Sequence, residues 1–558
     1  MPKHILVAIG GTGIRFAEAF IHLAASGAVD AGEYELCFVD MDFENGDYTR
    51  CSNALRHYEE ARKALNGSGA DNGSGAEFMK AELSLIKKEG RPTAWKLDDH
   101  MSSLLRATYD DKTTVKDLAR RDRAGETLLD FFMDKGELTR PLKKGFYGHP
   151  AVGAAVISAM FESEAFDESN PIVQTIQNNI TENIQITLVA SSFGATGASI
   201  FPNLAAKLRK VHMENISNAK GTLTINGVLA LPYHKLPPAQ NERNSVDAGE
   251  YLNESISILD YYNRSIPDKI QNSFNRLYFA GSDDLNRLNS AGYSLGGSNQ
   301  KHVFMPTELV GALLIRDSFQ QPNGAGRYFY YNKGADTAYI AFPEDVTKRL
   351  GVFTEFALAM EEYFWPHLLS LEDEAESCAS QRNDFLHMFR KIYPMRDMRT
   401  CQSDVGILQD ISQMIQAYRS ARLYFTDYFS FMRDIHRTMT ETFAFAENQE
   451  LRILRVGKEN KTNNFTPEYE RLYEGEAWLK NDEQTCSNKE SFRQNSPLIY
   501  NTVSMNVRDY DTQWRNSLLS EGTAEVALEA LREYAKAAYL EANHNRKRDR
   551  MNGGHTKQ

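Results

Sequence analysis

Several common signatures are missing from this sequence of 558 residues, and each absence excludes a class of protein. No apolar run approaches the roughly 18 residues that a membrane-spanning helix needs, so we expect no membrane span. The apolar stretch at residues 5–9 is too short for a signal peptide and runs into glycines. Only five cysteines occur and none is spaced as C-x-x-C, which argues against structural zinc and favours reduced thiols in the cytoplasm.

The motifs of two large enzyme classes are also absent. There is no G-x-S-x-G motif, so no Ser-His-Asp triad can be argued, and there is no P-loop pattern G-x-x-x-x-G-K-S/T. The net charge is −12, and an acidic surface argues against nucleic acid and anionic membranes as partners. The short basic run at residues 546–550 is explained more simply as a solvated stretch than as a binding arm.

The sequence does contain three glycine-rich loops, each of which opens a predicted helix. The apolar strand 5–9 runs into Gly-Gly-Thr-Gly at 10–13, and the apolar strand 184–190 runs into Ser-Ser-Phe-Gly-Ala-Thr-Gly at 191–197. The third loop covers 144–149, and Pro150 after it suits the first turn of a helix. Small residues let backbone N–H groups approach an anion at the positive end of the helix dipole. Three such loops suit a ligand with several phosphates.

With these loops the chain resembles the tubulin/FtsZ superfamily, and in particular a divergent prokaryotic tubulin-like protein. Thr196 and Gly197 match the central Thr-Gly of the family signature GGGTGTG, and Gly194 matches one of the preceding glycines. Pro202 falls inside the next predicted helix, where the FtsZ-like pattern also has proline. The loop from 145 to 153 resembles the family's loop with Gly before Pro-x-Val-Gly, and the four loops occur in the family's order.

This resemblance implies that GTP or GDP binds at the carboxyl edge of a parallel sheet. Asp40 and Asp42 would be the strand-end acids, which could also hold Mg²⁺ directly or through water; no dedicated metal site is expected. The implied nucleotide contacts are Gly10, Gly11, Thr12, Gly13, Asp40, Asp42, Gly145, Gly148, His149, Ser191, Ser192, Gly194, Ala195, Thr196 and Gly197.

The signature is altered in ways that bear on catalysis. Phe193 and Ala195 stand where the family has glycine, and a residue with a Cβ tolerates positive φ poorly. In the family, hydrolysis needs an acidic loop that enters the next subunit's site. The nearest candidate is Glu308, which could equally open the long central helix of the fold. We therefore expect a slow or assembly-dependent GTPase that self-associates.

Two other interpretations stay open. An NAD-binding Rossmann protein would also place glycines after the first strand and an acid after the second, but Phe16 breaks the fingerprint G-x-G-x-x-G. A structural tubulin-like protein could have lost its nucleotide. For single residues, Asp42 could simply cap a turn, Ser191 and Ser192 could satisfy strand-end backbone groups, and His149 could be a local hydrogen-bonding residue.

We predict an α/β nucleotide-binding domain over residues 1–320, with a parallel sheet and helices on both faces. Residues 66–140 are predicted as an inserted, helical elaboration on the rim of the site. Residues 321–558 are predicted as a small sheet followed by a mostly helical module that docks a partner protein. By resemblance, such chains belong to multi-protein systems, including defence against mobile elements.

Overall fold

The computed structural model describes most of the first half of the chain and parts of the second half. The described residues are 2–67, 77–96, 146, 150–161, 166, 170–215, 220–234, 248–282, 302–320, 326–332, 344–361, 365 and 405–442, with single residues and short stretches between 528 and 543.

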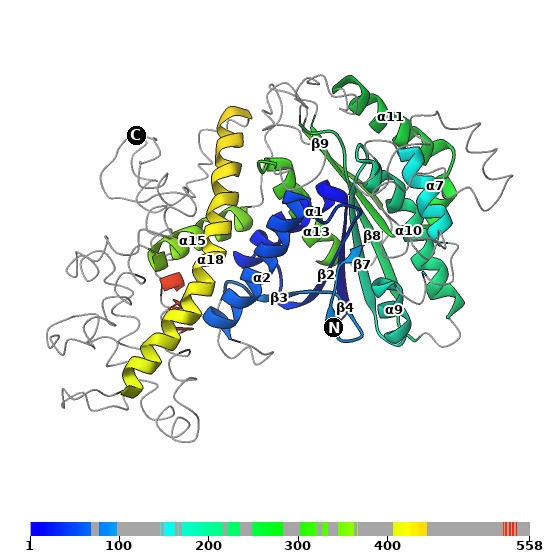
Figure 1. The fold of residues 1–558 in the computed structure, drawn as a ribbon. Helices are drawn as coiled ribbons and strands as arrows, with labels where there is room; N and C mark the ends of the chain where they lie inside the picture. The colour runs from blue at the N-terminus through cyan, green and yellow to red at the C-terminus, as the bar shows by residue number, and fades with distance from the viewer. Residues whose placement is uncertain are drawn as a thin grey trace.

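One wholly parallel sheet forms the centre of the molecule (Figure 1). Its strands follow the order β10-β9-β8-β7-β1-β2-β3, and β6 pairs with the end of β2. A separate two-stranded ribbon, β4-β5, is antiparallel. The bounds are β1 Lys3–Ile9, β2 Gly32–Asp40, β3 Ala81–Leu85, β4 Lys87–Lys88, β5 Arg91–Pro92, β6 Trp95–Lys96, β7 Ile184–Ser191, β8 Leu223–Ala230, β9 Arg276–Ser282 and β10 Gly326–Asn332.

The central strands are apolar throughout because both of their faces are covered. In β1 every residue from Ile5 to Ile9 is buried, as expected for a strand inside a parallel sheet. Successive side chains point to opposite faces: Leu6 and Ala8 enter one hydrophobic cluster, and Ile5 and Val7 enter the other. The sheet therefore separates two cores.

Helices cover both faces of the sheet, which confirms the predicted α/β class (Figure 1). On one face lie α1 Gly10–Ala25, α2 Gly46–Asn66 and α13 Pro306–Gln320. On the other lie α7 Pro150–Phe161, α9 Pro171–Asn178, α10 Ala195–Glu214, α11 Ala248–Arg264 and α12 Pro267–Ser273.

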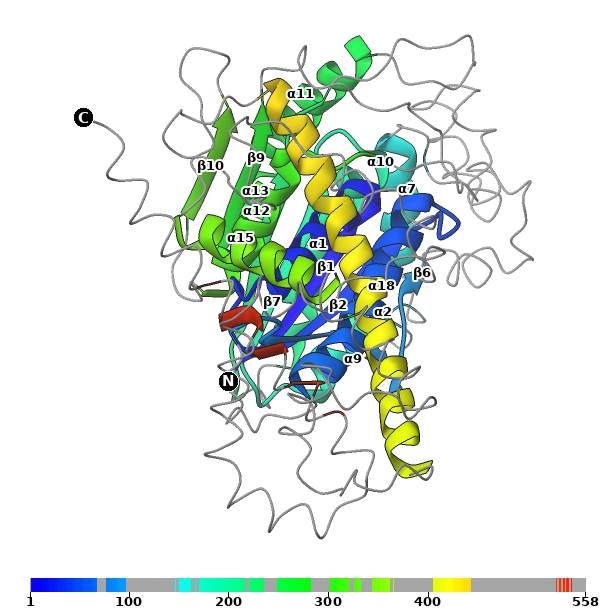
Figure 2. The same ribbon diagram turned by 90° about the vertical axis from the view of Figure 1, so that its left-hand side faces the viewer.

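Two helices from the second half of the chain form an outer layer, in which one lies against α2 and the other packs against the first. They are α15 Glu344–Ala359 and α18 Val405–Thr442, and Figure 2 shows α18 lying along α2. The rings of Tyr58 and Tyr424 are 5.5 Å apart, and those of His22 and Phe431 are 4.6 Å apart. These helices share one hydrophobic cluster with one face of the sheet, so they are continuous with that core.

Two predictions differ from the observed arrangement, one on where the main sheet ends and one on the secondary structure of an insertion. The strand expected at 328–331 is present, but as β10 it extends the main sheet beyond residue 320 instead of starting a small separate sheet. Within the 66–140 elaboration, the described residues 77–96 form β3 to β6 where we expected helix. Its remainder and the strand expected at 338–342 lie outside the described residues.

No helix among the described residues is both long and apolar enough to cross a membrane.

Candidate functional site

The strand order reverses between β1 and β7. From β1 the chain moves to β2 on one side, and it returns to β7 on the other side. In doubly wound sheets, ligands bind outside the carboxyl ends of the strands at this point. The register pairs Ile9 with Val39 and Ala8 with Val189, so the loops after β1, β2 and β7 are neighbours.

The two described glycine-rich loops meet at this point. A Cβ on Gly10 would lie 3.5 Å from the Thr196 Cβ and from the Gly197 backbone N. Gly10 has φ +71°, a left-handed conformation that favours glycine. Gly13 is needed for a different reason, because a Cβ there would lie 2.5 Å from the Val189 carbonyl O. This glycine lets α1 pack directly on β7.

The helices that start from these loops have N-termini without side-chain caps. Ile9 precedes α1 and Gly194 precedes α10; neither makes a capping hydrogen bond, and neither first turn holds an acid. Elsewhere the chain does cap helices: Asn45 accepts a hydrogen bond at the start of α2, and Asn170 accepts two at the start of α9. The residues that precede α1 and α10 therefore do not use their side chains to occupy the first N–H groups of these helices, which are the groups that bind anions at helix N-termini.

The third helix start lies beside the first turn of α10. The Ser199 hydroxyl is 2.9 Å from the Pro150 carbonyl O, and Gly153 packs closely against Ser199. Of the loop before Pro150, only Phe146 is described, and it is buried. The predicted contacts Gly145, Gly148 and His149 lie outside the described residues.

Proline inside α10 has a specific local consequence. Pro202 lies within the helix, as predicted, and cannot donate the usual hydrogen bond to the Ala198 carbonyl. The Tyr262 hydroxyl of α11 donates to that carbonyl at 2.6 Å. Helix α11 is therefore tied to the first turn of α10.

The two serines at the end of β7 serve the loop itself. The Gly194 N–H donates to the Ser191 Oγ at 3.1 Å, which closes the turn before α10. Ser192 is fully buried; its Oγ lies 2.6 Å from the Ser255 Oγ of α11, and its N–H donates to the Ala230 carbonyl. These contacts fit the interpretation in which the serines satisfy strand-end groups. Thr12, Gly194 and Thr196 keep part of their surface exposed.

Asp40 and Asp42 have different surroundings at the end of β2. Burial raises the pKa of Asp40 to about 7, although its Oδ1 accepts the Met41 N–H at 2.8 Å. Asp42 accepts the Glu44 N–H at 3.1 Å and thus caps the following turn. A buried carboxylate such as Asp40 would gain from a ligand hydroxyl or a bound cation. No group of three or more His, Cys, Asp or Glu side chains in the described part of the chain could hold a metal ion by itself.

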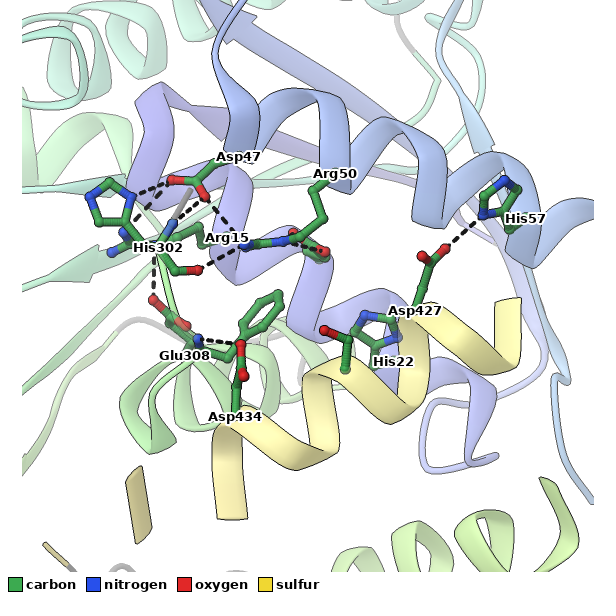
Figure 3. Close-up of polar contacts among 12 residues, drawn as sticks. Arg15, His22, Asp47, Arg50, His57, His302, Glu308, Asp427 and Asp434 are labelled. Carbon is green, nitrogen blue, oxygen red and sulfur yellow. Dashed lines mark hydrogen bonds and ion pairs between the residues drawn. The ribbon is translucent and has the colours of Figure 1, made fainter. Parts of the chain in front are cut away.

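Glu308 lies in the first turn of α13 and is fully buried (Figure 3). Its Oε1 is 2.9 Å from the Arg15 Nε and accepts the Tyr233 hydroxyl at 2.9 Å. Its Oε2 accepts the Met305 N–H at 2.9 Å. Both carboxylate oxygens of Glu308 are thus engaged within the chain. This fits the interpretation that Glu308 opens α13, and no oxygen of its carboxylate is exposed to a neighbouring subunit.

Arg15 on α1 is the centre of a buried polar cluster that the sequence analysis did not identify (Figure 3). It is 4 % exposed, donates to the Tyr233 hydroxyl and lies 3.9 Å from the Asp47 carboxylate. Burial alone would lower the Arg15 pKa, but Tyr233, Glu308 and Asp47 raise it overall, so the guanidinium stays charged.

The cluster continues to α2 and to the segment before α13. The Asp47 carboxylate accepts the His302 N–H at 2.9 Å, and its other oxygen is 2.5 Å from the His302 Nδ1. Burial would raise the pKa of Asp47, but contacts with His302, Arg15 and Arg50 lower it below its usual range. Arg50 forms two hydrogen bonds with Glu18 of α1 and donates to the His302 carbonyl at 2.8 Å.

A signal for this cluster was present in the sequence. Arg15, Glu18 and His22 recur at helical spacing within an otherwise apolar helix, and all three are buried. Polar residues on the inward face of a helix need partners, because an unpaired buried charge is costly.

Comparison with protein-family models, with curated proteins and with solved structures found no match to this chain.

Proposed function

We propose that this chain binds a guanine nucleotide, GTP or GDP, with its phosphates over the N-termini of α1 and α10. The observation that carries the proposal is the meeting of two helix N-termini without side-chain caps at the reversal point, where a Cβ on Gly10 would lie 3.5 Å from Thr196 and from the Gly197 backbone. Small residues there leave backbone N–H groups within reach of an anion, and the helix dipoles place partial positive charge at the same ends.

The preference for guanine derives from the tubulin-like signature around Thr196, Gly197 and Pro202. A second candidate ligand is a dinucleotide such as NAD. Asp40 favours a dinucleotide, because it lies at the end of β2, one residue beyond the Ile9–Val39 pair. Rossmann proteins place a ribose-binding acid at this position. If Mg²⁺ accompanies the nucleotide, Asp40 and the phosphate oxygens would hold it, and it would neutralise phosphate charge.

Ligand binding is tested on the full chain after removal of any co-purified nucleotide. Calorimetry and thermal shift are measured with GTP, GDP, ATP and NAD, each with and without Mg²⁺. A hydrogen bond to a charged phosphate contributes roughly 1.5–3 kcal/mol, so Gly11→Val should weaken binding by about tenfold or more. The matched control is Gly32→Val, because Gly32 starts β2 at the opposite edge of the sheet and its nearest neighbour is a side-chain atom 3.6 Å away.

Binding of GTP that is weakened by Gly11→Val alone would support the proposal. A shift with ATP or NAD but not GTP would reject the guanine preference, and no shift with any of the four would reject nucleotide binding.

We also propose that hydrolysis is slow, because the family's trans-acting acid has no exposed equivalent at Glu308. Phosphate release is measured at rising protein concentration, with light scattering to follow self-assembly. Turnover that rises steeply with concentration and disappears in Glu308→Gln, with the fold checked by circular dichroism, would contradict this proposal.

The second half of the chain is proposed to dock a partner protein. Size exclusion of the full chain with the products of neighbouring genes, with and without GTP, tests this. Co-elution that depends on GTP would support it, and filaments of this chain alone without co-elution would contradict it.

A further inference from the structure

The altered signature loop carries an aromatic ring that packs into the body of the protein. Phe193 stands where the tubulin-like signature has glycine, directly before Gly194. Its ring centroid is 6.0 Å from that of Tyr233 and 5.7 Å from that of His234, and it packs against the larger hydrophobic core. A glycine could not make these contacts, so this loop is attached to the segment after β8.

Tyr233 joins the loop to the buried ion pair. It follows β8 and is fully buried, and its hydroxyl accepts from Arg15 and donates to the Glu308 Oε1. Arg15 stands in the second turn of α1, whose first residues are the Gly10–Gly13 loop. The loop after β7 and the helix α1 are therefore joined through Tyr233, by a ring contact with Phe193 on one side and a hydrogen bond with Arg15 on the other.

The same cluster reaches the outer helix α18. Arg50 lies over the Phe304 ring, 4.2 Å from its centroid, and the Phe304 ring is 4.9 Å from that of Phe431 in α18. The Phe304 N–H also points to the Asp434 carboxylate of α18 at 3.4 Å (Figure 3). Consecutive contacts thus run from the loop before α10, through Tyr233, Arg15 and Asp47, to α18.

We propose that Phe193 and the Arg15 cluster couple ligand binding at the reversal point to the docking of α18 on α2. This inference rests on the proposed nucleotide binding. A phosphate that fixes the Gly194–Gly197 turn also fixes the attached Phe193 ring, and close packing allows Tyr233 little independent movement. Bound nucleotide should then hold α18 more firmly, and by reciprocity firmer docking of α18 should strengthen nucleotide binding.

A second contact between α2 and α18 provides a control. His57 of α2 is 2.7 Å from the Asp427 carboxylate of α18 (Figure 3). None of the hydrogen bonds described above joins this pair to Arg15 or to Tyr233. His57→Gln should loosen α18 without interrupting the connection to the ligand.

The experiment is hydrogen exchange of backbone amides in residues 405–442 of the full chain, with and without saturating GTP and Mg²⁺. In the wild type, GTP should slow exchange in α18 by at least about fivefold, the lower end of typical coupling. Phe193→Leu keeps an apolar side chain but removes the ring, and Tyr233→Phe removes only the hydroxyl. Both variants should lose most of the GTP effect on α18, and their GTP affinity should fall by about the same factor.

In His57→Gln, exchange in α18 without GTP should be faster than in the wild type, and GTP should still slow it by the wild-type factor. If GTP binds but leaves α18 exchange unchanged, the coupling is wrong and the proposed function stands. If both Phe193→Leu and Tyr233→Phe respond to GTP like the wild type, the coupling does not run through these residues. If GTP does not bind at all, the proposed function fails, and the coupling fails with it.

Discussion

The first helix carries two regions whose polar groups are satisfied in opposite ways. At Gly10–Gly13 the side chains are small, and no side chain caps the helix N-terminus. One turn further along, Arg15 and Glu18 are almost fully buried, and each has a partner of opposite charge on another helix.

If the proposed function holds, this difference separates residues that bind a ligand from residues that stabilise the fold. An open N-terminus on the solvent side costs little in the free protein, because water can satisfy it. A buried charge is tolerated only with its partner, so the cluster must be complete before α1, α2 and α13 can pack. Mutations in the first region should act mainly on binding, and removal of a charge in the second should act mainly on stability, beyond the smaller effect on affinity that the proposed coupling predicts.

The largest expected effect is on stability, from Arg15→Ala. The change leaves Glu308 buried without its cation and removes one of the cations near Asp47, and breaking a buried pair costs about 3–5 kcal/mol. Urea denaturation followed by circular dichroism measures the loss. The matched control is Arg56→Ala. Arg56 and Glu60 form an ion pair of 3.6 Å on the surface, so this change should alter stability by less than about 1 kcal/mol.

A double variant separates unpaired charge from lost packing. Arg15→Met with Glu308→Met removes both charges and keeps long apolar side chains, so it should recover part of the stability lost in Arg15→Ala. Equal costs for Arg15→Ala and Arg56→Ala would show that the buried cluster does not stabilise the fold.

A smaller effect is expected from Asp40, and it should depend on pH. The folded-state pKa is about 7, whereas an ordinary aspartate titrates near about 3.9, so between these values the unfolded chain binds fewer protons. Stability should therefore fall as the pH rises from about 4 to about 7, by at most about 4 kcal/mol from this group. Asp40→Asn should match the wild type near pH 4 and be more stable at pH 8.

Thermal denaturation across this pH range checks the prediction. The control is Asp42→Asn, because Asp42 lies two residues away and caps a turn. A gain for Asp40→Asn that is the same at pH 4 and pH 8 would contradict a raised pKa as its cause.

The sequence was sufficient to predict the α/β class and the positions of the central strands, because local pattern determines them. The apolar run in β1, the glycines after it and the proline in α10 each act within a few residues. The prediction of helix over β3 is wrong, although the buried Ala81 and Leu83 alternate with the exposed Glu82, which is the two-residue period of a strand.

The pairing of distant segments could not be predicted from local pattern. Nothing near residue 328 indicates that β10 pairs with β9 in the main sheet, and nothing near Gly311 indicates that it packs against the Phe16 ring. The partners of Arg15 come from residues 47, 233 and 308, so the cluster exists only after the helices have packed. By contrast, a glycine-rich loop is recognisable because its function depends on its own backbone.

The smallest expected change in stability, together with a large change in binding, comes from Gly10→Ala. Gly10 has φ +71°, so a Cβ should cost about 1–2 kcal/mol in backbone strain, while its nearest neighbour at 3.5 Å is an ordinary contact. Strain of this size is relieved by turning the peptide, which would redirect the N–H groups that face the proposed phosphate. Gly90→Ala is the matched control, because Gly90 has φ +77° with no atom within 4 Å and lies in the β4-β5 ribbon. Calorimetry with GTP and urea denaturation are measured on both variants. We expect similar losses of stability and a loss of GTP affinity in Gly10→Ala alone; equal affinities would place the ligand away from α1 and remove the distinction between its two regions.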